Sequence, residues 1–191
     1  MILWINGPFG GGKSTLADEL IGRMPGALKF DPEYVGFVLR EFVPMPPSND
    51  FQDIPLWRKL VADFAVGMLD EYKSPLIVPM TLLRDDYRDE IFDRIAESGY
   101  KIQHIFLTLS HQTLTERVRR QVLRPDDLEK DEEIRADRIR KHQMAVKAQS
   151  GLSSDTWVIS NDQVTIAQVV DEVLTRLGGI APLSSFDDSR G

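Results

Sequence analysis

Short apolar runs alternate along the chain with longer stretches in which apolar residues recur every three or four positions. The runs predict strands at 2–6, 27–30, 75–80, 102–109 and 157–159. The stretches predict helices at 13–24, 57–72, 85–97, 110–124, 132–149 and 164–177, and a further helix begins at Asp31-Pro32-Glu33. Because strand and helix alternate five times, the pattern predicts an α/β fold with a parallel sheet between helices.

Composition narrows the class of protein. The chain has 191 residues, of which 42% are apolar and 28% charged, so we expect one globular domain. The absence of cysteine excludes a disulfide scaffold, a thiolate zinc site and a cysteine nucleophile. The net charge of −7 argues against nucleic acid as a partner. No apolar run is long enough to cross a bilayer and the first residues lack a basic signal segment, so we expect a cytoplasmic protein.

The first strand leads into the sequence GPFGGGKS, residues 7–14, which fits the pattern G-x-x-x-x-G-K-[ST]. Glycines at these positions let backbone N–H groups turn toward phosphate oxygens, and the following helix adds positive potential at its N-terminus. Lys13 is then expected to contact the β- and γ-phosphates of ATP, and the Ser14 hydroxyl to ligate Mg²⁺. A plain glycine-rich turn is the alternative. The nucleotide-binding candidates in this segment are Gly7, Gly10, Gly11, Gly12, Lys13, Ser14 and Thr15.

A phosphate-binding loop does not define the reaction, and three features favour a small kinase. The chain is short, it has no N-K-x-D sequence for reading guanine, and seven of its fifteen arginines lie between residues 117 and 140. The spacing i, i+3, i+7 places Arg117, Arg120 and Arg124 on one face of the predicted helix 110–124. Guanidinium groups suit a transferring phosphoryl group. The alternative is a solvated helix face paired with neighbouring carboxylates.

Two strand ends carry further candidates. Asp31 follows the second strand, and ligands of such sheets lie beyond the carboxyl ends of the strands. Asp31 can accept a hydroxyl proton or hold Mg²⁺-bound water, or it can simply cap the next helix; Glu33 is the alternative carboxylate. The third strand ends at Thr81, where a Walker B motif would place an aspartate, and Arg84 follows. His104 is expected to be structural and His142 to lie on the surface.

Several longer blocks carry a resemblance to a known family. WINGPFGGGKS, DPEYVGFVLREFVP, DFQDIPLWR, LIVPMT and GLSSD resemble the tunicamycin-resistance protein family in order and spacing, over roughly residues 1–183. That family is similar to small P-loop kinases. The resemblance implies a P-loop NTPase three-layer αβα sandwich with a five-stranded parallel sheet of order 2-3-1-4-5, an arginine-bearing lid and bound ATP. It also implies Asp31 as base, phosphate contacts from Arg117, Arg120 and Arg124, and Asn161 in the loop beside adenine.

The resemblance also divides the chain into segments. Residues 1–178 are expected to form one kinase-like domain, with an acceptor-covering segment at 43–73 and the lid at 117–140. The expected substrate contacts are Phe37, Arg40, Gln52, Trp57, Arg58, Thr81 and Arg84. Core packing is the alternative for Trp57. Residues 179–191 form a tail without the basic amphipathic helix that family members can carry, so we expect no stable membrane anchor.

Three functions fit these observations. The first is an ATP- and Mg²⁺-dependent phosphotransferase acting on a hydroxyl of tunicamycin or another nucleoside-like compound. The second is a nucleotide-dependent protein that sequesters the antibiotic without chemistry, which the missing Walker B acid leaves open. The third is a metabolic nucleoside or sugar kinase. The sequence leaves the oligomeric state open.

Overall fold

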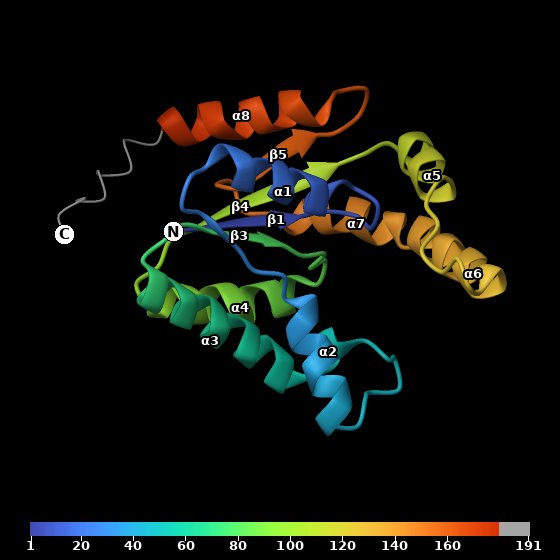
Figure 1. Cartoon of the computed structure of the whole chain (residues 1–191), viewed down its shortest axis with the longest axis horizontal. Helices are drawn as coiled ribbons and strands as arrows, with labels where there is room; N and C mark the ends of the chain where they lie inside the picture. Colours follow the sequence, from blue (N-terminus) through green and yellow to red (C-terminus); the bar gives the residue numbers. More distant parts are fainter. Residues whose placement is uncertain (180–191) are drawn as a thin grey trace.

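A central parallel sheet organises the computed structural model, which describes residues 1–179 (Figure 1). Its five strands lie in the order β2-β3-β1-β4-β5, which confirms the predicted order 2-3-1-4-5. The strands are β1 (Ile2–Asn6), β2 (Leu28–Lys29), β3 (Leu76–Pro79), β4 (Ile102–Thr108) and β5 (Trp157–Ser160). The central strand β1 is buried throughout, as its unbroken apolar run predicts.

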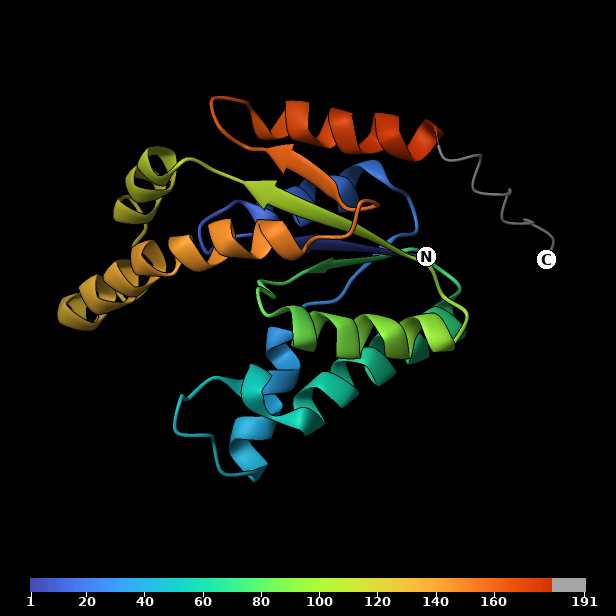
Figure 2. The same ribbon diagram turned by 180° about the vertical axis from the view of Figure 1, so that it is seen from behind.

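The helices lie on both faces of this sheet. Helices α1 (Lys13–Arg23) and α8 (Ile166–Gly179) pack together on one face. Helices α3 (Pro55–Tyr72) and α4 (Asp85–Glu97) cover the other face, and Figure 2 shows α7 (His142–Ala148) on that side as well. The alternation of side chains along β1 explains both cores: Ile2 and Trp4 pack toward α3 and α4, whereas Leu3 and Ile5 pack toward α1.

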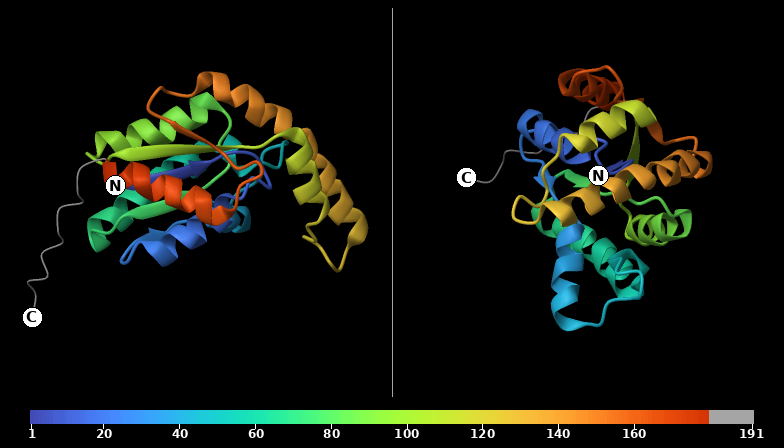
Figure 3. Two further views of the ribbon diagram at one scale, coloured as in Figure 1. Left: turned by 90° about the horizontal axis from the view of Figure 1, so that it is seen from above. Right: turned by 90° about the vertical axis from the view of Figure 1, so that its right-hand side faces the viewer.

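Three helices extend beyond the carboxyl ends of the strands. Helices α5 (His111–Arg119) and α6 (Leu128–Arg140) protrude there as an antiparallel pair (Figure 3). Helix α2 (Glu33–Phe42) packs against α3 and the short 3₁₀ helix η1 (Phe51–Asp53). A second 3₁₀ helix, η2 (Gln149–Gly151), follows α7. These segments surround the edge of the sheet where ligands of doubly wound folds bind.

Two sequence-based expectations about this region are wrong. The helix that begins after Ser110 ends at Arg119 and not near residue 124. The reason lies beyond its C-cap Arg120: the buried Asp131 carboxylate accepts hydrogen bonds from the backbone N–H groups of Leu123 and Arg124 and thereby holds a turn. His142 is buried and not on the surface, and its Nε2–H donates to the Leu109 carbonyl at 2.9 Å.

Helix α2 begins one residue later than the sequence indicates, with Pro32 at its N-cap and Asp31 before it. Within residues 1–179, none of the helices is long and apolar enough to span a membrane. The predicted tail, residues 179–191, lies outside the described residues apart from Gly179 at the end of α8.

Candidate active site

The loop between β1 and α1 has a backbone that glycine alone adopts readily. Gly10 and Gly12 have φ angles of 77° and 92°. A Cβ atom on Gly12 would lie 2.7 Å from Nδ2 of Asn161, and one on Gly10 would lie 2.8 Å from a methyl of Val118. Gly12 is the N-cap of α1, so the loop joins directly to the positive end of a helix. The loop therefore has the form of a phosphate cradle.

Lys13 closes over this loop. Its Nζ donates to the Pro8 carbonyl at 2.8 Å and to the Gly7 carbonyl at 3.3 Å. Burial lowers the pKa of the Lys13 ammonium to about 7, and the nearby carboxylates of Glu33 and Asp31 oppose that shift. The site thus holds too little negative charge to keep the Lys13 amine firmly protonated. A bound polyphosphate would supply that charge.

A cavity of about 520 Å³ opens in front of the loop. Ten residues expected from the sequence to be in the site line it: Gly10, Gly12, Lys13, Ser14, Thr15, Asp31, Thr81, Arg117, Arg120 and Asn161. Gly7 and Gly11 lie in the loop behind this lining. The cavity volume falls in the range of small-molecule sites.

Two carboxylates reach the cavity from the segment that follows β2. Oδ1 of Asp31 accepts a hydrogen bond from the backbone N–H of Glu33 at 3.0 Å, so Asp31 supports the start of α2 as well as lining the cavity. Desolvation and the neighbouring Asp31 raise the pKa of Glu33 above its usual range. Glu33 also lines the cavity, although the sequence marked it only as the alternative to Asp31.

The arginines reach the cavity from two helices and not from one face. Arg117 on α5 donates to the Asn161 carbonyl at 2.8 Å, and Arg120 at the end of α5 lies beside it in the lining. Arg124 lies in the exposed turn held by Asp131 and does not line the cavity, so the expected three-arginine face does not form. The third arginine in the cavity lining is Arg138 on α6, which donates to Oε1 of Gln121 at 2.7 Å.

Three polar residues at strand ends hold the loop in place. Asn6, at the end of β1, is buried, and its Oδ1 accepts from Gly7 N–H at 2.7 Å. Thr81, after β3, donates its hydroxyl to the Gly7 carbonyl at 3.1 Å. Asn161, after β5, donates from Nδ2 to the Gly11 carbonyl at 2.8 Å. Asn161 therefore supports the loop, and its role beside adenine stays a prediction.

The remaining expected substrate contacts lie outside the cavity lining. Trp57 is completely buried and donates from Nε1 to the Pro32 carbonyl at 3.1 Å, so core packing is the correct interpretation of this side chain. Arg40 donates to the Asn49 carbonyl at 3.1 Å. Phe37 is 46% exposed on α2, and its ring and that of Tyr34 form a T-shaped pair.

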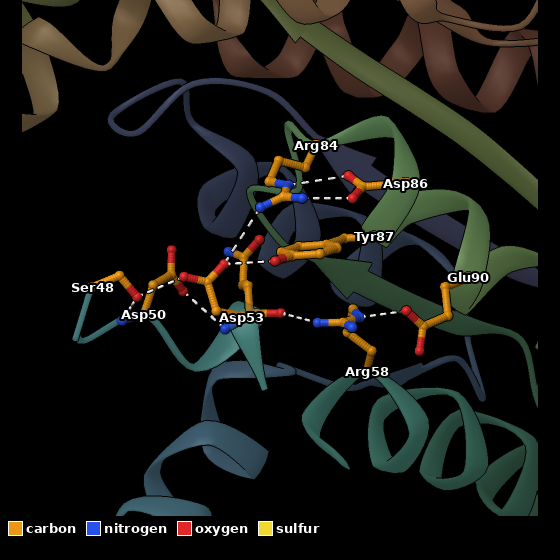
Figure 4. Close-up of polar contacts among 9 residues, drawn as sticks. Ser48, Asp50, Asp53, Arg58, Arg84, Asp86, Tyr87 and Glu90 are labelled. Carbon is orange, nitrogen blue, oxygen red and sulfur yellow. Dashed lines mark hydrogen bonds and ion pairs between the residues drawn. The ribbon is translucent and has the colours of Figure 1, made fainter. Parts of the chain in front are cut away.

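Arg58 and Arg84 belong to a cluster that joins η1 to α4 (Figure 4). Their guanidinium groups lie 4.1 and 3.8 Å from the centre of the Tyr87 ring. Arg58 is buried and donates to Glu90 at 2.5 Å and to the Gln52 carbonyl at 2.6 Å, and Tyr87 donates to Asp53 at 2.7 Å. Arg58 is therefore held among these partners and does not line the nucleotide cavity.

This cluster fixes the segment around η1 at the edge of the site. Arg84 is half exposed and pairs with Asp86. Gln52 donates from Nε2 to the Thr81 carbonyl at 3.0 Å, which ties η1 to the end of β3. The cluster thus positions the walls of the cavity without lining it.

The site fits Mg²⁺ and a nucleotide on the observations above. Extra Cβ atoms at Gly10 and Gly12 would meet the walls of the cradle, and Lys13 is held at its mouth. The Ser14 hydroxyl and the Asp31 carboxylate line the same cavity, and oxygen ligands of this kind suit Mg²⁺. The sequence did not single out three lining residues: Phe9 in the loop itself, and Gln121 and Arg138, whose positions depend on how α5 and α6 pack. Local spacing does not reveal that packing.

The sheet order, the loop and the cavity define a P-loop protein with a kinase-like fold. A family model described as an AAA domain matches residues 2–147, which is more than half of the chain. The chain therefore belongs to this AAA-domain family. A comparison with curated proteins found no match.

Solved structures share the architecture. The Deinococcus radiodurans tunicamycin resistance protein is 26% identical, with 93% of this chain and 95% of that chain covered at a TM-score of 0.67. A gluconokinase from Sinorhizobium meliloti is 17% identical, with 94% and 92% covered at a TM-score of 0.62. The Mycobacterium tuberculosis APS kinase is 16% identical, with 93% and 96% covered at a TM-score of 0.56. The last two likenesses show the fold alone.

Proposed function

We propose that this protein is an ATP-dependent phosphotransferase that transfers the γ-phosphoryl group of ATP to a hydroxyl of tunicamycin and so confers resistance in the cytoplasm. One observation carries the proposal: a single cavity is lined by the phosphate cradle, by Asp31 and Glu33, and by Arg117, Arg120 and Arg138. The similarity to a tunicamycin resistance protein supports the choice of acceptor.

Each group of residues around the cavity has its own role in the proposed transfer. Mg·ATP, when bound, would supply the phosphoryl group and the positive charge that offsets the charge of the phosphates. The cradle and Lys13 bind the phosphates, and Ser14 provides the hydroxyl for the metal. Asp31 orients the acceptor hydroxyl and accepts its proton. Arg117, Arg120 and Arg138 surround the cavity with guanidinium groups that stabilise negative charge on the transferring group.

The test is mass spectrometry of tunicamycin after incubation with the protein and Mg·ATP. We expect the drug to gain one phosphoryl group with the wild type and none with Lys13→Ala. Asp31→Asn should lower turnover by about 10²- to 10⁴-fold while ATP still binds. The matched control is Asp171→Asn, because Asp171 is an exposed acid paired with Arg23 on the surface and should leave turnover unchanged. Full activity of Asp31→Asn would remove its role as base.

A parallel variant separates the two carboxylates. If Glu33→Gln abolishes turnover and Asp31→Asn does not, Glu33 is the base and Asp31 supports α2. The neutral Thr81 at the end of β3 keeps sequestration as the second candidate function. Tight ATP-dependent binding of tunicamycin without any mass gain would establish sequestration. Neither binding nor mass gain would direct the search to a sugar or nucleoside acceptor.

A further inference from the structure

Exposed apolar side chains gather on one part of the described surface, on α2 and the neighbouring turn of α3. Tyr34, Val38 and Phe42 follow one another at intervals of four on α2, and Phe64 on α3 stands opposite. Tyr34 is 68% exposed, Val38 58% and Phe64 56%. Four apolar side chains left to water in one place are costly and usually indicate a binding surface.

This part of the surface is a groove and not a flat patch. A second cavity of about 510 Å³ lies between α2 and α3, where they meet the edge strand β2. The rings of Phe30 and Phe64 stack in its wall with centroids 5.1 Å apart. Its lining is mostly apolar: Lys29, Phe30, Asp31, Tyr34, Val35, Val38, Phe64 and Met68. Its size and lining suit a hydrophobic ligand group.

The groove begins at the proposed site of chemistry. Asp31 lines both this groove and the nucleotide cavity. A molecule with a hydroxyl at Asp31 can therefore extend an attached chain directly along α2, over Tyr34 and Val38. Lys29, the other charged residue in the lining, is paired with Asp18 at 2.6 Å, so no unpaired cation in the lining selects a polar ligand.

We propose that this groove binds an apolar tail, such as an acyl chain, of the molecule that accepts the phosphoryl group. The acceptor is then an amphiphile, with its hydroxyl at Asp31 and its tail between α2 and α3. This proposal rests on the proposed function, because it places the reacting hydroxyl at Asp31. Tunicamycin, with its fatty chain, is one compound of this class. The continuity through Asp31 favours a tail over a second copy of the chain or a bilayer surface.

The first experiment does not depend on catalysis. Dansyl-undecanoic acid, whose fluorescence rises in apolar surroundings, is titrated into wild type, Val38→Glu and Val146→Glu. Val146 is the matched control, because it is 51% exposed on α7 and lies away from the groove. We expect saturable binding to wild type and Val146→Glu, and at least tenfold weaker binding to Val38→Glu, because the new carboxylate would be buried against the tail. Phe64→Ser, which removes the stacked ring, should weaken binding as well.

The second experiment links the groove to the acceptor. Tunicamycin should displace the probe, and the same compound with its acyl chain removed should not. In the turnover assay Val38→Glu should raise KM for tunicamycin about tenfold without changing ATP affinity, and Val146→Glu should change neither. Probe binding that is not saturable, or that Val38→Glu leaves unchanged, overturns the proposal.

The remaining outcomes separate this proposal from the proposed function. Phosphorylation of tunicamycin with an unchanged KM in Val38→Glu overturns the groove and leaves the function intact. If the groove binds the probe but tunicamycin neither displaces the probe nor is phosphorylated, the groove is supported and belongs to another amphiphilic acceptor. Loss of self-association or of vesicle binding in Val38→Glu, with the probe unaffected, assigns the surface to a second copy or to a bilayer and overturns the proposal.

Discussion

Replacing Asn6 by alanine tests how strongly the strand ends hold the phosphate-binding loop. Nδ2 of Asn6 donates to the Leu82 carbonyl at 2.6 Å and lies 3.3 Å from Nε2 of His104. Oδ1 accepts from the N–H groups of Gly7 and Leu82 at 2.7 and 2.9 Å. One buried side chain therefore joins the loop after β1, the loop after β3 and strand β4.

The cost of Asn6→Ala can be worked out from these contacts. The substitution leaves three buried backbone groups without a partner, namely Gly7 N–H, Leu82 N–H and the Leu82 carbonyl. At about 1 to 1.5 kcal/mol for each group, the free energy of unfolding should fall by about 3 to 4.5 kcal/mol. A typical domain has a free energy of unfolding of roughly 5 to 15 kcal/mol, so this loss is a large share of the total. ATP affinity should fall as well, because Gly7 loses the contact that fixes its N–H.

The assay is urea unfolding followed by tryptophan fluorescence, with ATP affinity from calorimetry on the same samples. The control is Gln103→Ala on the adjacent strand β4, whose side chain bonds to the carbonyls of His104 and Asp155 near the surface. We expect that variant to lose less than about 1 kcal/mol. A loss below about 1 kcal/mol for Asn6→Ala would refute the reasoning, because it would mean that the freed backbone groups find other partners.

Two further predictions concern the loop itself. Gly12→Ala should destabilise the protein by about 1 to 3 kcal/mol and weaken ATP binding, because φ is 92° and the new methyl meets Asn161. The control is Gly22→Ala in α1, where the new methyl meets nothing within 4 Å, so the change should be neutral or stabilising. Urea unfolding of both variants checks this prediction. ATP affinity of the wild type should fall as pH rises from 7.5 to 9, because a Lys13 pKa of about 7 leaves the free amine uncharged and ATP binding must then take up a proton. Calorimetry in buffers of different ionisation enthalpy should show that proton uptake, and Lys13→Met should lose both the uptake and this pH dependence.

The sequence predicts the loop and the sheet well because both depend on local patterns. The apolar run of β1 and the glycines after it act over a few residues. The positions of the arginines depend on contacts between distant residues, and there the prediction fails. A spacing of i, i+3, i+7 defines a face only while the helix continues, and Asp131 ends this helix before Arg124 is reached.

The inward direction of Trp57 and Arg58 could not be read from sequence for a related reason. Amphipathic spacing shows that α3 has a buried stripe, but it does not show whether that stripe faces the sheet or the ligand cavity. The structure places Trp57 against the start of α2 and Arg58 against Tyr87, so both serve packing. From the sequence, Glu33 is only the alternative to Asp31, because its approach to Lys13 depends on where α2 begins relative to the loop.

The contacts of Thr81 explain why a neutral residue follows β3 in this site. The carbonyl groups of Gly7 and Gly11 accept hydrogen bonds from Thr81, Lys13 and Asn161, and all three are donors. These bonds hold the carbonyls away from the centre of the cradle, so that loop N–H groups are free to face phosphate oxygens. An ionised carboxylate at position 81 has no hydrogen to donate and would meet the Gly7 carbonyl with like partial charge. Thr81 therefore stabilises the loop at the position where other P-loop proteins bind the metal, and the carboxylates available in the cavity lining are those of Asp31 and Glu33 beyond β2.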